Sequence, residues 1–354
     1  RSIITNNMNN MHQAIDLTKA LNKDSDMTSR EFDILKEISS VTGFISSRNI
    51  WRSKYWGKNL GASHWLGKYD KKDAVLKIQG VRPNVSEIYM IEEFSKQNKS
   101  ILVGPPSILR SILWNDKNNY EAINAEHASG DKVVVDGKIA TSENIATFLS
   151  YYKEYRQNCI PMKPWLPKPE SNTNNLNMAL DSLIATSFKA YPKSKLREEE
   201  DFALAKSAYS VLTTVYAKIE LEFIHGHFSC KDLIYKNNDS KQVILFSNLF
   251  WKWRYPFFDA VFGYHWFMYE LANVKDITPV QVDNQRKLWL DEIYKVTGAI
   301  NSKRTRKLVN AALLERSVAG FIIDSFLCDP KKKISKYLYK STKDEAQRLI
   351  KELR

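Results

Sequence analysis

The stretch Phe223-Ile-His-Gly-His-Phe-Ser-Cys-Lys-Asp-Leu-Ile-Tyr235 decides how this chain is interpreted. A His-Gly pair is followed by two side chains that can carry chemistry, His227 and Asp232, and then by an apolar run typical of a short strand. A surface turn between a helix and a strand could have the same composition. The remaining sequence must therefore decide between a turn and a functional site.

Length and composition indicate a folded protein of two domains or lobes. The chain has 354 residues, of which 43% are hydrophobic and 26% charged, as in ordinary globular proteins. No apolar stretch approaches the length of a membrane span, and the first residues lack the apolar core of a secretory signal. We therefore expect a cytoplasmic protein with no membrane partner.

Cysteine and charge content exclude some classes of site. Cys159, Cys230 and Cys328 are widely spaced and form no Cys-x-x-Cys pair, so neither a disulfide framework nor a thiolate zinc site is indicated. His225 and His227 could join Cys230 at a metal, but a fourth ligand is missing. The formal net charge of +13 favours polyanionic partners in general, although lysine runs are more often solvated surfaces.

Hydrophobic patterning predicts an α+β fold with three ranges. Residues 1–44 are expected to form a partly flexible helical extension, 45–128 a small lobe with antiparallel strands and one helix, and 129–354 a mainly helical lobe. A Thr-x-x-Glu signal through Glu31 opens the first helix, and Asp136-Gly137 predicts a hairpin over 132–139. Further helices are expected near 84–97, 142–156, 174–189, 198–224, 257–273, 281–296 and 302–328, and further strands over 108–114 and 122–127.

Two residues of the small lobe stand out because they are charged within apolar patterns. Lys77 lies in the strand-like run Ala74 to Gln79. In the helix that follows, Glu87 shares a face with the apolar residues Ile91 and Phe94. A carboxylate on a buried face needs a partner. Either a cation elsewhere in the fold supplies it, or Glu87 closes a capping box with Asn84.

The loop at 225 resembles the catalytic loop of the aminoglycoside phosphotransferase and choline kinase branch of the protein kinase-like fold. That loop reads H-G-D, four residues, then N-I-L. Here His227 occupies the Asp position, Asp232 the Asn position, and Leu233 to Tyr235 the following strand. The resemblance implies a bilobal fold, with a small antiparallel-sheet lobe carrying one helix and a larger mainly helical lobe.

The same resemblance assigns roles to other residues. Lys77 is implied to contact nucleotide phosphates, with Glu87 holding it, and the hinge segment ending in Glu126 and His127 is implied to contact an adenine ring through backbone groups. The segment 243–259 is similar to the metal-binding strand and the helix start of the family. It places Ser247 where the family has its metal-binding Asp.

Departures from the family pattern bear on activity. Ser247 offers a neutral ligand where Mg²⁺ prefers an anionic oxygen, which makes Mg²⁺ binding doubtful even if Asp232 is retained as a weak metal ligand. His227 could act as a base in place of Asp. The glycines at 57, 61 and 67 match neither a G-x-G-x-x-G nor a Walker motif.

Three functions follow as hypotheses. The first is a pseudokinase that binds ATP or a protein partner. The second is an atypical ATP-dependent phosphotransferase acting on a small-molecule hydroxyl, with His227 as base. The third, less favoured, is nucleic-acid binding through the basic aromatic stretches 51–56 and 251–255, whose tryptophans could equally fill the core. The sequence identifies no specific partner.

Overall fold

The computed structural model describes residues 28–354, apart from 53–61, 81, 115–116, 118, 136, 170–171 and 191–195. The chain folds into two compact units that are discontinuous in sequence. Unit 1 comprises the described residues up to Asn98, together with Gly104–Gly130 and Tyr235–Phe250. Unit 2 comprises Lys99–Val103, Asp131–Ile234 and Trp251–Arg354. Residues 235–250 thus belong to unit 1, whereas the sequence analysis assigns the whole range 129–354 to the helical lobe.

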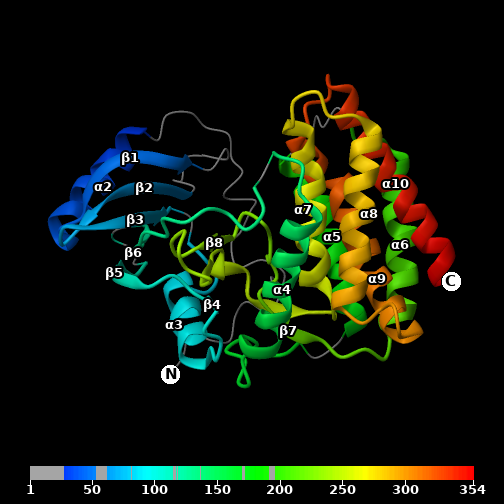
Figure 1. The fold of residues 1–354 in the computed structure, drawn as a ribbon, viewed down its shortest axis with the longest axis horizontal. Coiled ribbons are helices and arrows are strands. Elements are labelled where there is room, and N and C mark those ends of the chain that lie inside the picture. Colours follow the sequence, from blue (N-terminus) through cyan, green and yellow to red (C-terminus); the bar gives the residue numbers. More distant parts are fainter. Residues whose placement is uncertain are drawn as a thin grey trace. The chain divides into compact units, whose positions relative to one another are not determined.

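Unit 1 is built on a five-stranded antiparallel sheet (Figure 1). Its strand order is β1-β2-β3-β6-β5. The β2–β3 hairpin turns through Asp70 and Lys71, which both have positive φ, as expected of the two-residue turns that match strand twist. The strands are β1 (Ile45–Arg52), β2 (Ala62–Tyr69), β3 (Lys72–Gln79), β5 (Ile108–Ile112) and β6 (Glu121–Glu126).

Two helices bury opposite faces of this sheet. Helix α2 (Thr28–Thr42) packs Ile34 and Ile38 in one core cluster with Trp65 and Leu76. Helix α3 (Glu87–Gln97) packs in a second cluster with Ile123 and Ala125 of β6. Because side chains alternate between the faces of a strand, Lys77 projects toward the face of α3 while its neighbour Leu76 projects toward α2.

Unit 2 is mainly helical. Helix α8 starts with a capping box between Thr278 and Gln281 and with Pro279 at its first position. Strands β7 (Glu222–Ile224) and β10 (Lys252–Arg254) pair antiparallel. The helices are α4 (Ser142–Asn158), α5 (Asn172–Ala190), α6 (Glu200–Tyr216), α7 (Phe258–Glu270), α8 (Pro279–Val296), α9 (Lys303–Ile322) and α10 (Lys333–Leu353), with the 3₁₀ turns η2 (Leu271–Asn273) and η3 (Asp324–Leu327).

The short elements near the boundaries of the units complete the fold. They are β4 (Val103–Gly104), β8 (Leu233–Tyr235), β9 (Val243–Leu245) and η1 (Asn248–Phe250). The small sheet unit and the larger helical unit confirm the predicted α+β class. Within the described residues, no helix is long and apolar enough to span a bilayer.

Several local predictions were wrong. The stretch 132–139 contains no strand pair among its described residues, because Val133 and Val134 are buried and Lys132 bridges to Ile234 instead. The helix predicted over 198–224 ends at Tyr216, since the last residues pair with β10 as β7. Helix α10 was not predicted.

The candidate glycine positions are only partly described. Residues 57 and 61 lie outside the described part of the chain. Gly67 lies in β2, where an added Cβ would approach the backbone oxygen of Ile45 to 2.2 Å. The glycine at 67 is therefore explained by the close approach of β1 and needs no phosphate-binding role.

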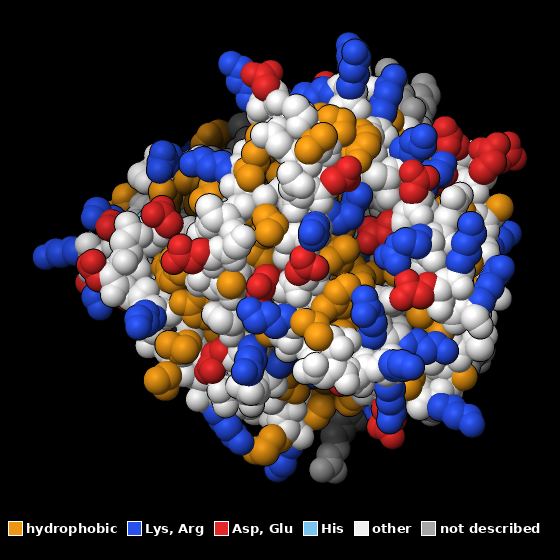
Figure 2. All heavy atoms as spheres, turned by 45° about the vertical axis from the view of Figure 1, so that its right-hand side comes forward, with side chains coloured by type: hydrophobic (Ala, Val, Ile, Leu, Met, Phe, Trp, Pro, Cys, Tyr) orange, Lys and Arg blue, Asp and Glu red, His pale blue; other side chains and the backbone are white. Residues whose placement is uncertain are grey.

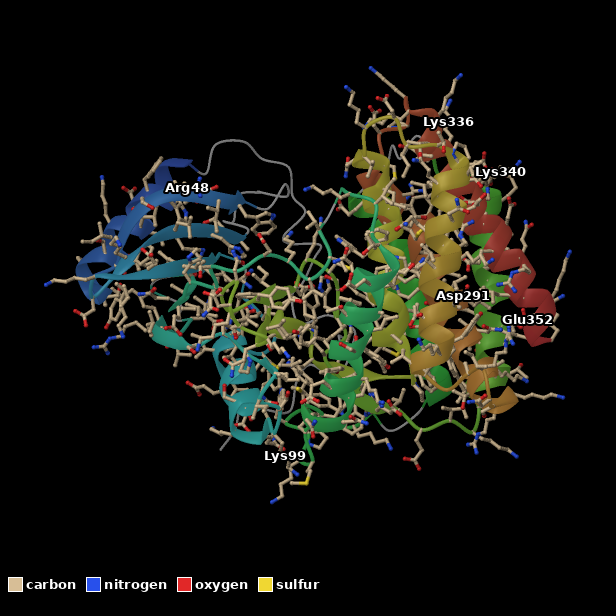
Figure 3. The ribbon with its side chains drawn as sticks, viewed as in Figure 1. Arg48, Lys99, Asp291, Lys336, Lys340 and Glu352 are labelled. Atoms are coloured by element: carbon tan, nitrogen blue, oxygen red, sulfur yellow. The ribbon has the colours of Figure 1, made fainter. Side chains whose placement is uncertain are left out.

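Part of the positive charge lies on exposed helix surfaces. On the face drawn in Figure 2, Lys and Arg side chains are interspersed with Asp and Glu. In unit 2, Lys336 and Lys340 project from α10 away from the neighbouring helices (Figure 3), and both are exposed. These lysines are therefore part of a solvated helix face.

Candidate functional site

Lys77 and Glu87 form an ion pair in unit 1 between the Nζ of Lys77 and the Oε2 of Glu87. The side chain of Glu87 is 5% exposed and that of Lys77 is 20% exposed. Ser86, not Asn84, is the N-cap of α3, and its side chain makes no capping hydrogen bond. Glu87 is thus the first helical residue, and the capping-box alternative is wrong.

The first turn of α3 is held by a carboxylate from the sheet. Glu121 on β6 accepts a hydrogen bond from the backbone N–H of Glu87 at 3.1 Å and another from the hydroxyl of Ser86 at 2.6 Å. Burial raises the pKa of Glu121, whereas the bond from Ser86 opposes that rise. A negative charge at a helix N-terminus is favourable, so Glu121 fixes the end of the helix that presents Glu87.

In unit 2, the backbone of the predicted catalytic loop is anchored from two helices. Asp259 on α7 accepts hydrogen bonds from the Gly226 N–H at 3.2 Å and from the Tyr155 hydroxyl at 2.9 Å. The same hydroxyl accepts from the backbone N–H of His225 at 2.7 Å. Gly226 has a φ of 76°, a conformation that favours glycine. This network determines the course of the loop up to His227.

Asp259 is buried, and desolvation raises the pKa of its carboxyl, while the hydrogen bonds from Gly226 and Tyr155 lower it. Burial likewise raises the pKa of Tyr155 well above its ordinary value. The phenol therefore stays protonated and can donate to Asp259 throughout the physiological range. Both groups accept hydrogen bonds from the backbone of the loop.

His227 and Asp232 lie in direct contact. Nδ1 of His227 is 2.8 Å from Oδ2 of Asp232, and the hydroxyl of Ser229 donates to the same oxygen. Asp232 is buried, whereas His227 is partly exposed. A carboxylate that accepts from Nδ1–H fixes the tautomer and the orientation of the ring. One oxygen of Asp232 therefore accepts hydrogen bonds from two side chains of its own loop.

The surroundings of His227 are aromatic and ionic. Its ring lies 4.5 Å from the ring of Phe262 and 5.9 Å from that of Trp266, between centroids. The guanidinium of Arg316 lies 4.7 Å from the Phe262 ring and pairs with Asp324. Burial raises the pKa of Asp324, and the charge of Arg316 lowers it. Unit 2 thus surrounds the loop with paired charges and stacked rings.

The other predicted site residues belong to unit 1. Glu126 ends β6, where its backbone N–H donates to Ser107, and the N–H of His127 donates to Asp73. Ser247 lies between β9 and η1 with a φ of 62°, uncommon for a residue other than glycine. Lys77, Glu87, Glu126, His127 and Ser247 are thus in unit 1, whereas His227, Asp232 and Asp259 are in unit 2.

The donor sets do not suit a metal-binding cage. Across the described ranges, no group of three or more His, Cys, Asp or Glu side chains is arranged to hold a metal ion. Taken separately, Ser247 of unit 1 offers a neutral oxygen, and in unit 2 one oxygen of Asp232 already accepts two hydrogen bonds. Mg²⁺ prefers hard, largely anionic oxygen ligands in octahedral geometry. These residues fit it poorly.

Comparison with known proteins supports the fold. No protein-family model and no curated protein matches the sequence. A thermostable mutant of aminoglycoside phosphotransferase APH(4)-Ia, in ternary complex with AMP-PNP and hygromycin B, matches with a TM-score of 0.54 and 9% identity over 90% of this chain and 98% of that one. An aminoglycoside phosphotransferase from Alicyclobacillus acidocaldarius subsp. acidocaldarius DSM 446 matches with a TM-score of 0.50 and 11% identity, over 87% and 92%. The chain therefore has the aminoglycoside phosphotransferase type of protein kinase-like fold.

Sequence reasoning missed several residues of these networks. Tyr155, Glu121 and Ser229 were not selected, although each holds a selected residue or its backbone. Ser229 had a local signal, because it lies three residues before Asp232. Tyr155 and Glu121 had none, since their partners are 104 and 34 residues away.

Proposed function

We propose that this chain is a kinase-fold protein without ordinary Mg²⁺-dependent phosphotransferase activity, a pseudokinase that binds a nucleotide or a protein partner. The observation that carries the proposal is the environment of Asp232. This carboxylate is buried, and one of its oxygens accepts from both His227 and Ser229. It is held as a structural acceptor, at the position where the family resemblance expects a metal ligand.

Two substitutions support the same conclusion. Phosphoryl transfer relies on metal ions that neutralise the phosphates and on a group that orients the attacking hydroxyl. His227 replaces the carboxylate expected for the second role, and Ser247 replaces the carboxylate expected for the first. The Lys77–Glu87 ion pair is present in unit 1, so the cation to which the family resemblance assigns phosphate binding is available there.

A nucleotide is the ligand that the comparisons favour. The similar enzyme APH(4)-Ia was solved with AMP-PNP and with ADP, in each case together with hygromycin B. A lysine ammonium held by a carboxylate can still donate to phosphate oxygens, because it has three N–H groups. We therefore infer that ADP or ATP binds without requiring Mg²⁺.

A direct test measures ATP hydrolysis by the purified full chain with saturating Mg²⁺ or Mn²⁺, beside the variant Lys77→Ala. We expect no metal-dependent turnover above that of the variant. Calorimetric titration with ADP in EDTA is expected to show binding that Lys77→Ala weakens. Metal-dependent turnover that is abolished by Lys77→Ala would overturn the pseudokinase proposal.

One observation favours an alternative function, phosphoryl transfer to a small-molecule hydroxyl with His227 as base. Asp232 holds Nδ1 of His227 at 2.8 Å, as an orienting carboxylate holds a catalytic imidazole. The base would accept the hydroxyl proton while the oxygen bonds to the γ-phosphorus and ADP leaves. The predicted result is turnover that is lost in His227→Gln.

A nucleic-acid partner has weaker support. In the stretch 251–255, Trp251 is buried and its ring contacts those of Tyr155, Trp165 and Phe223. A tryptophan held in the core cannot stack on a base. Steeply salt-dependent binding to single-stranded oligonucleotides would revive this possibility.

A further inference from the structure

Cationic side chains are concentrated at the start of helix α9 in unit 2. They are Lys303, Arg304, Arg306 and Lys307, which we call the α9 basic cluster, and all of them are exposed. Lys303 precedes Arg306 by three positions and Lys307 by four, so these like charges are neighbours on the helix surface and repel each other. The first turn contains no acidic residue to balance them. The α9 basic cluster therefore opposes formation of the helix that carries it.

The described residues provide no counterion for this cluster. No ion pair joins any of its members to an acid in the described part of the chain. Acids on the neighbouring helices are already paired, since Glu292 of α8 lies 3.4 Å from Lys295 and Glu352 of α10 lies 2.7 Å from Arg348. The cluster is thus an unbalanced positive charge at the surface, which attracts an anionic partner.

An exposed aliphatic side chain lies beside the α9 basic cluster. Ile300, in the loop between α8 and α9, is 61% exposed. Over the described part of 281–354, it is the one large hydrophobic residue that is exposed. Even fully extended chain would place its Cα within about 14 Å of that of Arg304. Cations and an apolar side chain therefore share one small area of the surface.

The backbone of the loop holds Ile300 outward. The N–H of Ile300 donates to the carbonyl of Tyr294 at 3.3 Å, and the N–H of Asn301 donates to that of Gly298 at 3.1 Å. Gly298 has a φ of 75°, a conformation that favours glycine. The preceding residue, Ala299, is buried. The exposure of Ile300 is therefore a property of an ordered loop.

We propose that Ile300 and the α9 basic cluster form a docking surface for an anionic lipid bilayer, with the cations at the headgroups and the isoleucine inserted between them. Peripheral binding of this kind combines attraction to anionic lipids with burial of apolar area. It needs no membrane-spanning segment, whose absence from the sequence led us to expect no membrane partner. The proposal revises that expectation and is independent of nucleotide binding and phosphoryl transfer.

The chemistry of the surface favours a bilayer over a nucleic acid. Proteins that bind single-stranded nucleic acids combine cations with aromatic rings that stack on bases. Here the guanidinium of Arg306 lies 5.0 Å from the centroid of the Tyr294 ring and covers it, so a cation already occupies that ring face. Ile300 has no ring to stack on a base, whereas an exposed aliphatic side chain gains free energy on entering the apolar part of a bilayer.

Co-sedimentation of the full chain with lipid vesicles tests the surface. The wild type is expected to bind vesicles of phosphatidylcholine mixed with phosphatidylserine, and not vesicles of phosphatidylcholine alone. Arg304→Gln with Lys307→Gln should weaken binding about tenfold or more, because each cation near an anionic membrane adds several-fold to the affinity. Lys336→Gln with Lys340→Gln is the matched control, which removes the same charge from an exposed face of α10 (Figure 3) and should bind as the wild type does.

A second pair of variants tests the apolar contact. Ile300→Ser is expected to weaken vesicle binding several-fold, whereas Ile300→Leu should retain it, because only the first loses the apolar area. Thermal unfolding of each variant checks that it is folded. Equal losses in the two charge variants, equal binding by the wild type and Ile300→Ser, or no binding of the wild type to the mixed vesicles would each overturn the proposal. Binding to single-stranded oligonucleotides that Arg304→Gln with Lys307→Gln weakens, without any vesicle binding, would assign the surface to a nucleic acid instead.

Discussion

Nδ1 of His227 lies 2.8 Å from Oδ2 of Asp232, an oxygen to which Ser229 also donates. Two side chains of the same loop are therefore bonded to each other. This arrangement satisfies a buried carboxylate with its own loop, which is a structural role. It also orients an imidazole, which is what a catalytic base would need.

The first prediction concerns the stability of this loop. Asp232→Ala is expected to lower the free energy of unfolding by about 1–3 kcal/mol, because it removes a buried acceptor from two donors. Ser229→Ala should cost less, since His227 still donates to the carboxylate. Urea unfolding of both variants measures the effect, and Ser150→Ala, at an exposed position of α4, is the control. Equal stability of Asp232→Ala and the control would contradict the structural role.

The second prediction concerns the Lys77–Glu87 pair. Lys77→Met should destabilise unit 1 by about 2 kcal/mol or more, because it leaves Glu87 buried without its cation. The double variant Lys77→Met with Glu87→Leu is expected to recover much of that loss, as replaced buried ion pairs often do. Lys68→Met, which breaks the exposed pair with Asp73, should have a much smaller effect. Additive losses in the double variant would show that the pair is not coupled.

The third prediction concerns pH and His64. The pKa of His64 falls to about 3 on folding, mainly through burial. Between about pH 6.5 and pH 3 the unfolded chain therefore binds a proton that the folded chain does not, and acidification lowers the stability by at most about 1.4 kcal/mol per pH unit. His64→Gln lacks this contribution, so its stability relative to the wild type should rise as the pH falls. Denaturation curves from pH 8 to pH 4 test this, and parallel pH profiles would argue against it.

The fourth prediction concerns the anchor of the catalytic loop. Tyr155→Phe removes the hydroxyl that donates to Asp259 and accepts from the His225 N–H, and we expect a loss of about 1–3 kcal/mol. Because that bond lowers the pKa of Asp259 while burial raises it, its loss raises the pKa further. A carboxyl with a raised folded-state pKa loses stability as the pH rises through it, so the defect should be larger at pH 7 than at pH 4. The control is Tyr152→Phe, which makes the same substitution three positions earlier on α4.

The fold was predictable because its signals are local or ordered along the chain. Lys77 in a strand, Glu87 on an apolar helix face and the loop at His227 occur in the order that the resemblance requires, and similar solved structures confirm the fold. The errors were also local. Asp136-Gly137 matched a hairpin turn, but Val133 and Val134 are buried and Lys132 bridges to Ile234, and the helix ending at Tyr216 was extended into a strand.

The sequence by itself determined which chemical groups are present: a histidine at 227, a serine at 247, and a lysine and a glutamate in amphipathic elements. Only the tertiary structure decided their partners. Glu121 caps α3, Tyr155 anchors the loop through Asp259, and Trp51 meets His64 because strand register and helix packing bring them together. Hydrogen bonds and ring contacts act over a few ångströms of space, and distance along the chain does not determine that separation.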